Sequence, residues 1–182
     1  MALGAWMGDM PQVAWWRSQE GSGGQFVEQT THIVDLLRYT AGEVTEVYAA
    51  YGNRVVQEHF ENVTVPDVGT VTMKLQSGAV ATISNTCILP GGVSEVGLHL
   101  YTDSGILAWS PERLEIHLPG TKTAYTGQDN PYVAETEAFI HALRTGDTSR
   151  ILSDYADAVK TQRITCAALE SARTGNLVPI RD

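Results

Sequence analysis

Three ionisable side chains fall along one edge of a helix predicted over residues 21–42. Glu28, His32 and Asp35 stand at positions i, i+4 and i+7, which lie one above another on a helix surface. Histidine titrates near neutral pH, and a neighbouring carboxylate orients its ring. The spacing therefore predicts a proton relay from Glu28 through His32 to a bound hydroxyl or carbonyl. Asp35 is a hydrogen-bond acceptor rather than a catalyst, and we count it with the substrate-binding residues.

A plainer interpretation of the same spacing stays open, in which Glu28 and His32 form a surface pair on a structural helix. A metal site would use these two residues as ligands. The other four histidines stand in unrelated contexts and supply no third ligand, so we predict no metal.

Trp15, Trp16 and Arg17 precede this helix in a predicted loop, where they are candidates for the wall of a substrate pocket. Packing of both indoles against a sheet is an equal alternative. The glycines of the following segment GSGGQF do not make a dinucleotide fingerprint, because Phe26 occupies the position of its third glycine. The sequence therefore assigns no cofactor-binding residue.

Apolar side chains hold the predicted helix in place. Phe26, Ile33 and Leu37 share one face, and Gly42 follows as a cheap left-handed helix end. Farther along, the chain predicts a second helix from Pro131 to Gly146. A third begins at a cap on Ser153 and ends at Gly175.

Between these helices the apolar residues alternate with a period of two, which predicts strands. The turn at residues 76–78 joins two of them into a hairpin, so the pairing is antiparallel. The predicted strands are residues 2–8, 43–51, 68–75, 79–87, 95–100, 106–109, 113–118 and a short closing strand or tail at 177–180.

These elements predict one α+β domain over residues 1–182, an open, mostly antiparallel β-sheet with helices on one face. The other face carries residues such as Thr70, Thr72 and Tyr101, and either water or a second subunit would cover it.

Composition narrows the partners. The formal net charge of −9 argues against nucleic acid and against an anionic membrane surface. No apolar run is long enough to span a bilayer, and no leader pattern follows Met1. Cys87 and Cys166 are expected to be buried free thiols in a reducing compartment, with a disulfide as the alternative. We therefore expect a cytoplasmic protein with no membrane partner.

The segment GGQFVEQTTHIVDLLRYTAGEV, followed by the alternating strands, resembles the C-terminal domain of the glucose–fructose oxidoreductase / inositol dehydrogenase (Gfo/Idh/MocA) family. The later segments ETEAFIHALRTG and SDYADAVKTQRITCAALESARTGNLVPI resemble the closing helices of that family. The resemblance covers nearly the whole chain. In the family, an N-terminal Rossmann domain binds NAD or NADP, and the second domain supplies the substrate pocket and an oligomer-forming open sheet.

The resemblance implies that this chain lacks the N-terminal dinucleotide-binding domain and is the substrate-binding, catalytic half of an NAD(P)-dependent oxidoreductase. The substrate would be a sugar, cyclitol or related polyol. The chain alone is expected to be inactive and to bind no NAD or NADP, and to form a homodimer or homotetramer through its open sheet face. The alternative function is a non-catalytic binding or dimerisation module on the same scaffold.

The resemblance also assigns roles to two residues. The family combines a lysine from the Rossmann domain with an acid and a histidine four residues later, and the last two correspond to Glu28 and His32. His32 would be the general acid/base at the reacting hydroxyl. Family members more often carry aspartate at the first position, so Glu28 is a departure that changes the reach of the acid.

Overall fold

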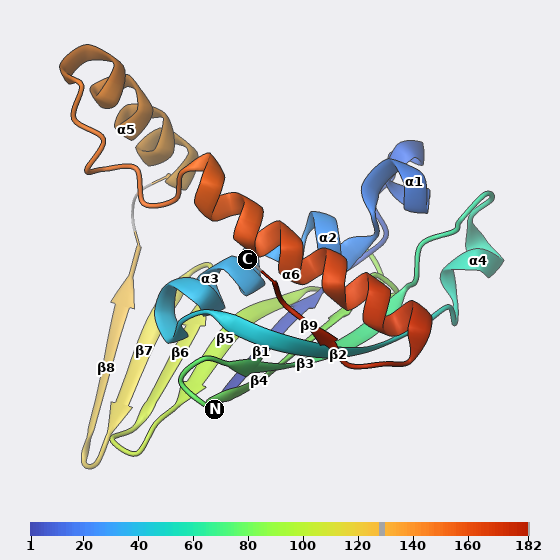
Figure 1. Ribbon diagram of the computed structural model, residues 1–182, viewed down its shortest axis with the longest axis horizontal. Helices are drawn as coiled ribbons and strands as arrows, with labels where there is room; N and C mark the ends of the chain where they lie inside the picture. Colours follow the sequence, from blue (N-terminus) through green and yellow to red (C-terminus); the bar gives the residue numbers. More distant parts are fainter. Residues whose placement is uncertain (128–129, 182) are drawn as a thin grey trace.

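The computed structural model describes residues 1–127 and 130–181. Within these residues, nine strands form one open sheet in the order β8-β7-β6-β5-β1-β4-β3-β2-β9 (Figure 1). All neighbouring strands are antiparallel except β1 and β4, which are parallel. The strands are β1 (Ala2–Met7), β2 (Val44–Gly52), β3 (Val68–Leu75), β4 (Val80–Thr86), β5 (Glu95–Tyr101), β6 (Ile106–Ser110), β7 (Arg113–Leu118), β8 (Thr121–Thr126) and β9 (Val178–Pro179). The predicted α+β class is confirmed.

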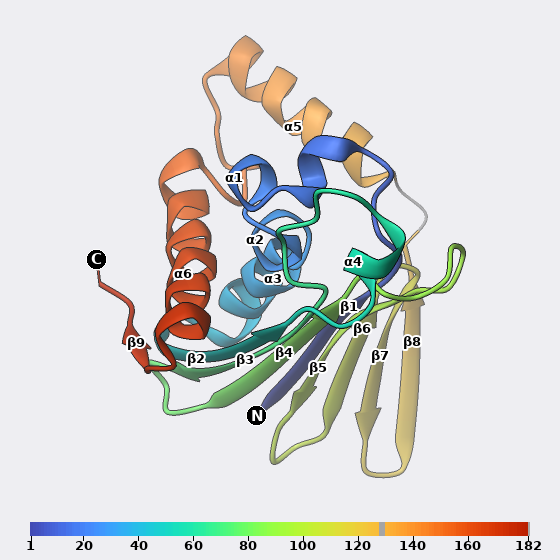
Figure 2. The same cartoon turned by 90° about the vertical axis from the view of Figure 1, so that its right-hand side faces the viewer.

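Helices cover one face of this sheet, as predicted, and no helix of the described residues lies on the other face (Figure 2). They are η1 (Ala14–Arg17), α1 (Gln19–Ser22), α2 (Gln25–Glu28), α3 (Thr31–Ala41), α4 (Val56–His59), α5 (Pro131–Thr145) and α6 (Tyr155–Thr174). Among the described residues, η1, α1, α2 and α4 are each four residues long, and α3, α5 and α6 are longer.

The core lies between the sheet and the helices α3 and α6. Ile33 and Leu37 on α3 are fully buried, as their spacing predicts, and they pack with Met73 of β3 and Ile164 of α6. Burying each such side chain stabilises the fold by roughly 1.5–3 kcal/mol. Apolar packing therefore fixes α3 against the sheet.

The prediction that one unbroken helix carries both Glu28 and His32 is wrong, because the stretch of residues 21–42 is broken twice, first in its glycine-rich entry and again after Glu28. Gly23 and Gly24 adopt φ angles of 76° and 87°, which separate α1 from α2. A second break follows Glu28, where the Thr30 N–H bonds back five residues to the Gln25 carbonyl before α3 starts. Glu28 and His32 therefore lie on different helices.

The side chain of Gln25 gives a physical reason for the second break. It donates to the Thr86 carbonyl at 3.0 Å and accepts from Asn85 Nδ2 at 2.8 Å, at the end of β4. These buried contacts tie α2 to the sheet, and α3 leaves in its own direction.

Three smaller expectations also need correction. The N-cap of α6 is Asp154, which accepts from the Asp157 N–H at 2.8 Å, and not Ser153. Cys166 is exposed, while Cys87 is buried as expected; both are free thiols. The strand β8 was not predicted, because all its side chains are exposed and no apolar alternation marks it.

The helix α5 is present where predicted, from Pro131 to a left-handed end at Gly146, but it makes no extensive contact with another described element. It projects beyond the sheet (Figure 1) and buries none of its residues. Its apolar residues, Val133, Phe139, Ile140 and Leu143 among them, are exposed. The amphipathic pattern therefore predicted the helix correctly without identifying a partner for its apolar face.

Candidate functional site

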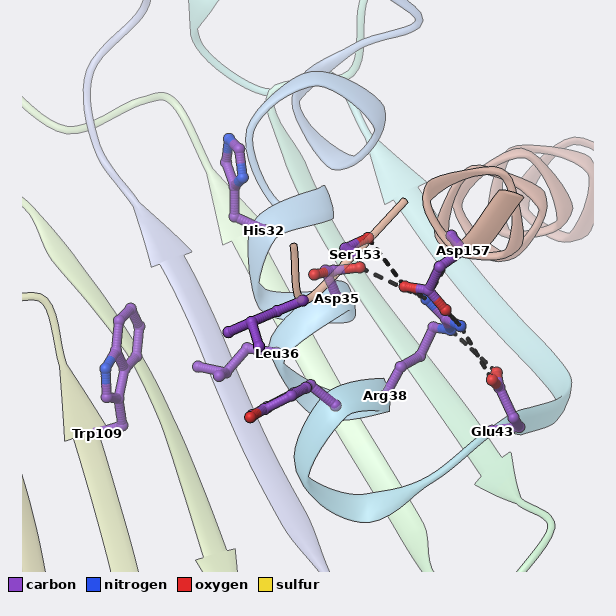
Figure 3. Close-up of a pocket in the computed structure, with 10 residues that line it drawn as sticks. His32, Asp35, Leu36, Arg38, Glu43, Trp109, Ser153 and Asp157 are labelled. Carbon is purple, nitrogen blue, oxygen red and sulfur yellow. Dashed lines mark hydrogen bonds and ion pairs between the residues drawn. The ribbon is translucent and has the colours of Figure 1, made fainter. Parts of the chain in front are cut away.

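A hollow of about 510 Å³ lies between α3, the segment before α6 and Trp109 of β6 (Figure 3). Its walls combine apolar and ionised side chains from parts of the chain more than 100 residues apart in sequence. The lining residues are His32, Asp35, Leu36, Arg38, Tyr39, Glu43, Trp109, Leu152, Ser153 and Asp157. Two sequence-predicted site residues, His32 and Asp35, are among them.

Arg38 organises the charged wall of this hollow. Its side chain is only 4% exposed, and it donates to Glu43 at 2.9 and 3.0 Å and to Asp157 at 2.8 Å. The Glu43 carboxylate is the main cause that raises the pKa of Arg38, and Arg38 in turn lowers the pKa of Glu43 and of Asp157. The network holds α3, the start of β2 and the first turn of α6 together.

Asp35 joins the same network from the adjacent turn of α3. It accepts from the Thr161 hydroxyl at 2.6 Å, and its oxygen lies 3.5 Å from Arg38. Its side chain is still 42% exposed. Asp35 is thus fixed by α6 while part of its carboxylate faces the hollow.

His32 lies in the first turn of α3, set apart from the Arg38 network (Figure 3). Its ring packs on the indole of Trp6, with 5.7 Å between ring centroids and 33° between planes. This stacking limits the orientations of the imidazole at the rim of the hollow.

Glu28 is not a lining residue. Its Oε2 accepts from Trp16 Nε1 at 2.7 Å, and within residues 1–127 and 130–181 no hydrogen bond joins it to His32. The break before α3 explains this, because the i, i+4 relation no longer applies across it. The carboxylate and the imidazole are neighbours in sequence with separate supports.

The three residues predicted as a pocket wall have different surroundings. Trp15 is 55% exposed, whereas Trp16 is 1% exposed. The guanidinium of Arg17 lies 4.1 Å from the ring centroid of Phe60, next to α4. None of the three lines the hollow beside His32.

Sequence reasoning missed several residues of the hollow, namely Arg38, Glu43, Trp109 and Leu152. Arg38 carried a weak signal, since it follows Asp35 by three positions on the same helix. Trp109 carried none, because its approach to α3 depends on how the sheet curves under the helices.

The glycine segment at residues 21–24 does not have the geometry of a nucleotide cradle. It joins two four-residue helices instead of a strand and a long helix. A Cβ at Gly23 would lie 2.9 Å from the Val27 side chain, so this glycine is required by packing. Across the described residues, no three His, Cys, Asp or Glu side chains gather as a metal site. Nor does any described helix have the length and apolar content needed to cross a membrane.

A second hollow of about 410 Å³ lies on the helix-free sheet face. Here Glu115 bonds Lys122, His117 and Arg113 at 2.8–3.0 Å. Lys122 is the main cause that lowers the pKa of Glu115 to about 2, with His117 next. His99, Tyr101 and Ser110 also line it. This face therefore carries fixed charges as well as threonines.

Comparison with known proteins gives consistent matches. A family model described as the GFO/IDH/MocA C-terminal domain matches residues 2–118. An uncharacterized protein of Schizosaccharomyces pombe is 29% identical over 180 residues, covering 86% of this chain and 44% of that protein. The myo-inositol 2-dehydrogenase of Thermotoga maritima is 35% identical over 65 residues, covering 36% of this chain and 20% of that enzyme.

A solved structure shares the fold. Levoglucosan dehydrogenase in complex with NADH and levoglucosan superposes with a TM-score of 0.80 at 20% identity, covering 100% of this chain and 58% of that one. These two matches include most or all of this chain. The chain spans only about half the length of each of the two proteins.

Proposed function

Because this chain belongs to the GFO/IDH/MocA C-terminal domain family, we propose that it is the substrate-binding, catalytic half of an NAD(P)-dependent oxidoreductase. Its substrate is a sugar, cyclitol or related polyol. The observation that carries the proposal is the placement of His32, at the rim of a hollow of about 510 Å³ with both ionised and aromatic walls. The proposed enzyme includes a separate dinucleotide-binding domain. This is supported by levoglucosan dehydrogenase in complex with NADH, of which the present chain covers 58%.

The lining supports a neutral polyhydroxylated substrate. Asp35 offers its second carboxylate oxygen to hydroxyl donors, beside the Arg38-bound carboxylates of Glu43 and Asp157, and Trp109 offers an aromatic surface to C–H groups. The hollow is lined by three carboxylates and one guanidinium, so its net charge is negative and would repel an anionic sugar acid. Two of the similar proteins, myo-inositol 2-dehydrogenase and levoglucosan dehydrogenase, are named for substrates of this chemical class, which supports the proposal.

His32 is the proposed general base for the oxidation of a substrate hydroxyl. Its imidazole accepts the hydroxyl proton as the C–O bond becomes a carbonyl, and returns it in the reverse direction. A bound NAD or NADP would supply the hydride acceptor for the same substrate carbon. Trp6 keeps the ring of His32 in place during the transfer.

The test is turnover of the complete enzyme on neutral polyols with NAD and NADP. We expect His32→Ala to lower turnover by about 10²–10⁴-fold, the usual effect of losing a positioned acid or base. The matched control is His141→Ala on α5, which lies away from the hollow and should leave turnover unchanged. Its melting temperature and that of His32→Ala should remain within a few degrees of the wild type.

The separation of Glu28 from His32 favours a second candidate, a binding or dimerisation module without catalysis. Unchanged turnover in His32→Ala, or no turnover of any polyol by the complete protein, would support that candidate. Lost turnover together with an equally large loss of stability would give His32 a structural role.

The remaining parts of the proposal concern the assembly and its surroundings. The helix-free sheet face, with Thr70, Thr72 and Tyr101, is the proposed homodimer or homotetramer surface. A cytoplasmic location is proposed on the two free thiols. The isolated chain is expected to be catalytically silent and to bind no NAD or NADP.

A further inference from the structure

A hydrogen bond from a buried indole joins Trp16 to Glu28. The indole N–H of Trp16 donates to Glu28 Oε2 at 2.7 Å. An indole nitrogen can only donate, and the Trp16 residue is 1% exposed, so no bulk water replaces this acceptor. Hydrogen bonds to an ionised carboxylate are short and about twice as strong as neutral ones. The contact therefore holds Glu28 as a hydrogen-bond acceptor.

Trp16 is itself rigidly supported. It packs in a core cluster with Met10, Val56 and Cys87, separate from the core under α3. Its carbonyl accepts from the Ser22 hydroxyl at 2.7 Å, which ties η1 to α1. A buried, well-packed indole thus fixes the position of the carboxylate that it binds.

Glu28 lies at the end of α2, directly before the turn that leads to His32. The His32 N–H donates to the Gln29 carbonyl at 3.2 Å across this turn. Trp16 occupies Oε2 of Glu28, and no other hydrogen bond to the carboxylate is formed within the described residues. Oε1 is left to accept a proton or a hydroxyl.

We propose that Trp16 is a positioning residue: it fixes one oxygen of Glu28 so that the other serves His32 or the substrate hydroxyl. This inference rests on the proposed function. It also accounts for the glutamate at this position, because an aspartate would be one methylene shorter and would lose its reach to the indole. Trp16 then acts from inside the fold and touches no substrate.

The first experiment tests the contact without using activity. In ¹H–¹⁵N spectra of this chain, the Trp16→Phe variant identifies the Trp16 indole signal. We expect Glu28→Gln to shift that signal, with the exposed Trp15 indole as an unshifted reference, and we expect Trp16 to exchange its proton more slowly than Trp15. The proposal is overturned if Glu28→Gln leaves the Trp16 indole signal unshifted, or if the Trp16 indole proton exchanges as fast as that of Trp15.

The second experiment measures kinetics of the complete enzyme. We expect Trp16→Phe to lower kcat by about 10-fold to 100-fold, the scale of a misplaced catalytic group, with KM changed less than about twofold. Tyr125→Phe on the exposed strand β8 is the aromatic control and should leave both unchanged. In a Glu28→Ala background, Trp16→Phe should cause no further loss of kcat, because the two residues act as one unit.

The outcomes separate the inference from the function on which it rests. An unchanged kcat in Trp16→Phe, or an equal loss with and without Glu28, overturns the positioning role even if His32→Ala abolishes turnover. Unchanged turnover in His32→Ala overturns the proposed function, whereas the indole signal still decides whether Trp16 holds Glu28.

Discussion

At the scale of single residues, Asp67 illustrates how a buried charge is retained. Its carboxylate accepts the N–H groups of Arg54, Val55 and Val56 at 2.8–3.0 Å, and the residue is 1% exposed. Burial alone would raise the pKa of Asp67, but these backbone hydrogen bonds outweigh it and lower the pKa below its ordinary value. The same charge and, above all, burial raise the pKa of Cys87 to about 12.

We therefore predict that Asp67→Asn destabilises the chain at neutral pH by about 2–3 kcal/mol, since an amide cannot accept these bonds as an anion does. A lowered pKa in the folded state gives stability that is present above the unfolded value of about 3.9 and lost as pH falls through the folded value. Urea unfolding at pH 7 and in acid measures this: the gap between wild type and variant should narrow in acid.

The exposed Asp9→Asn is the control for this measurement and should change stability by less than about 0.5 kcal/mol. A gap for Asp67→Asn that stays constant from pH 7 into acid would contradict the charged role of Asp67.

At the scale of elements, α5 is expected to contribute little to the free energy of unfolding. Its apolar side chains are exposed, with Phe139 at 57% and Leu143 at 71%. We predict that Phe139→Gln with Leu143→Gln changes the free energy of unfolding of this chain by less than about 1 kcal/mol, because no burial is lost. Urea unfolding of the variant checks it.

The helix α6, which buries one side against the sheet, supplies the contrast. Ile164→Ala removes a side chain that is 1% exposed and should cost about 2–5 kcal/mol. A loss of that size in the α5 variant would show that α5 does pack on the body of this chain in solution.

Much of the architecture could be predicted from the sequence, because strand alternation and helix ends are local signals. The apolar face of Ile33 and Leu37 was identified correctly for the same reason. The break before α3 was not, since it depends on Gln25 binding the end of a strand about 60 residues away. The predicted pairing of Glu28 with His32 fails for this reason, because it depends on one unbroken helix.

At the scale of the whole molecule, the helix-free sheet face is broad and in register. Tyr48, Thr72, Thr82, Leu3 and His99 are successive cross-strand partners on it. Tyr48 is 49% exposed and Leu3 42%. Such a surface provides the apolar and hydroxyl groups that a face-to-face subunit contact needs, and a standard interface buries about 1,600 Å².

We predict that light scattering at high micromolar concentration returns the mass of a dimer or tetramer. Thr72→Lys places a charge inside the contact and should reduce the mass towards that of a monomer, because two like charges would face each other. Thr174→Lys, at the end of α6 on the helix side, should leave the mass unchanged. A wild-type monomer would refute the prediction.

The position of β1 in the sheet has a consequence for the order in which the molecule forms. β1 is the first of the nine described strands to be synthesised, yet its neighbours are β4 and β5, and the Met1 amino group donates to the Tyr101 carbonyl 100 residues later. Both edges of β1 remain unpaired until β4 and β5 are synthesised. The strands β5 to β8, by contrast, pair with their neighbours in sequence and need no distant segment. The earliest strand of this sheet is thus among the last to be enclosed, and until then its open edges are exposed to pairing with other polypeptides.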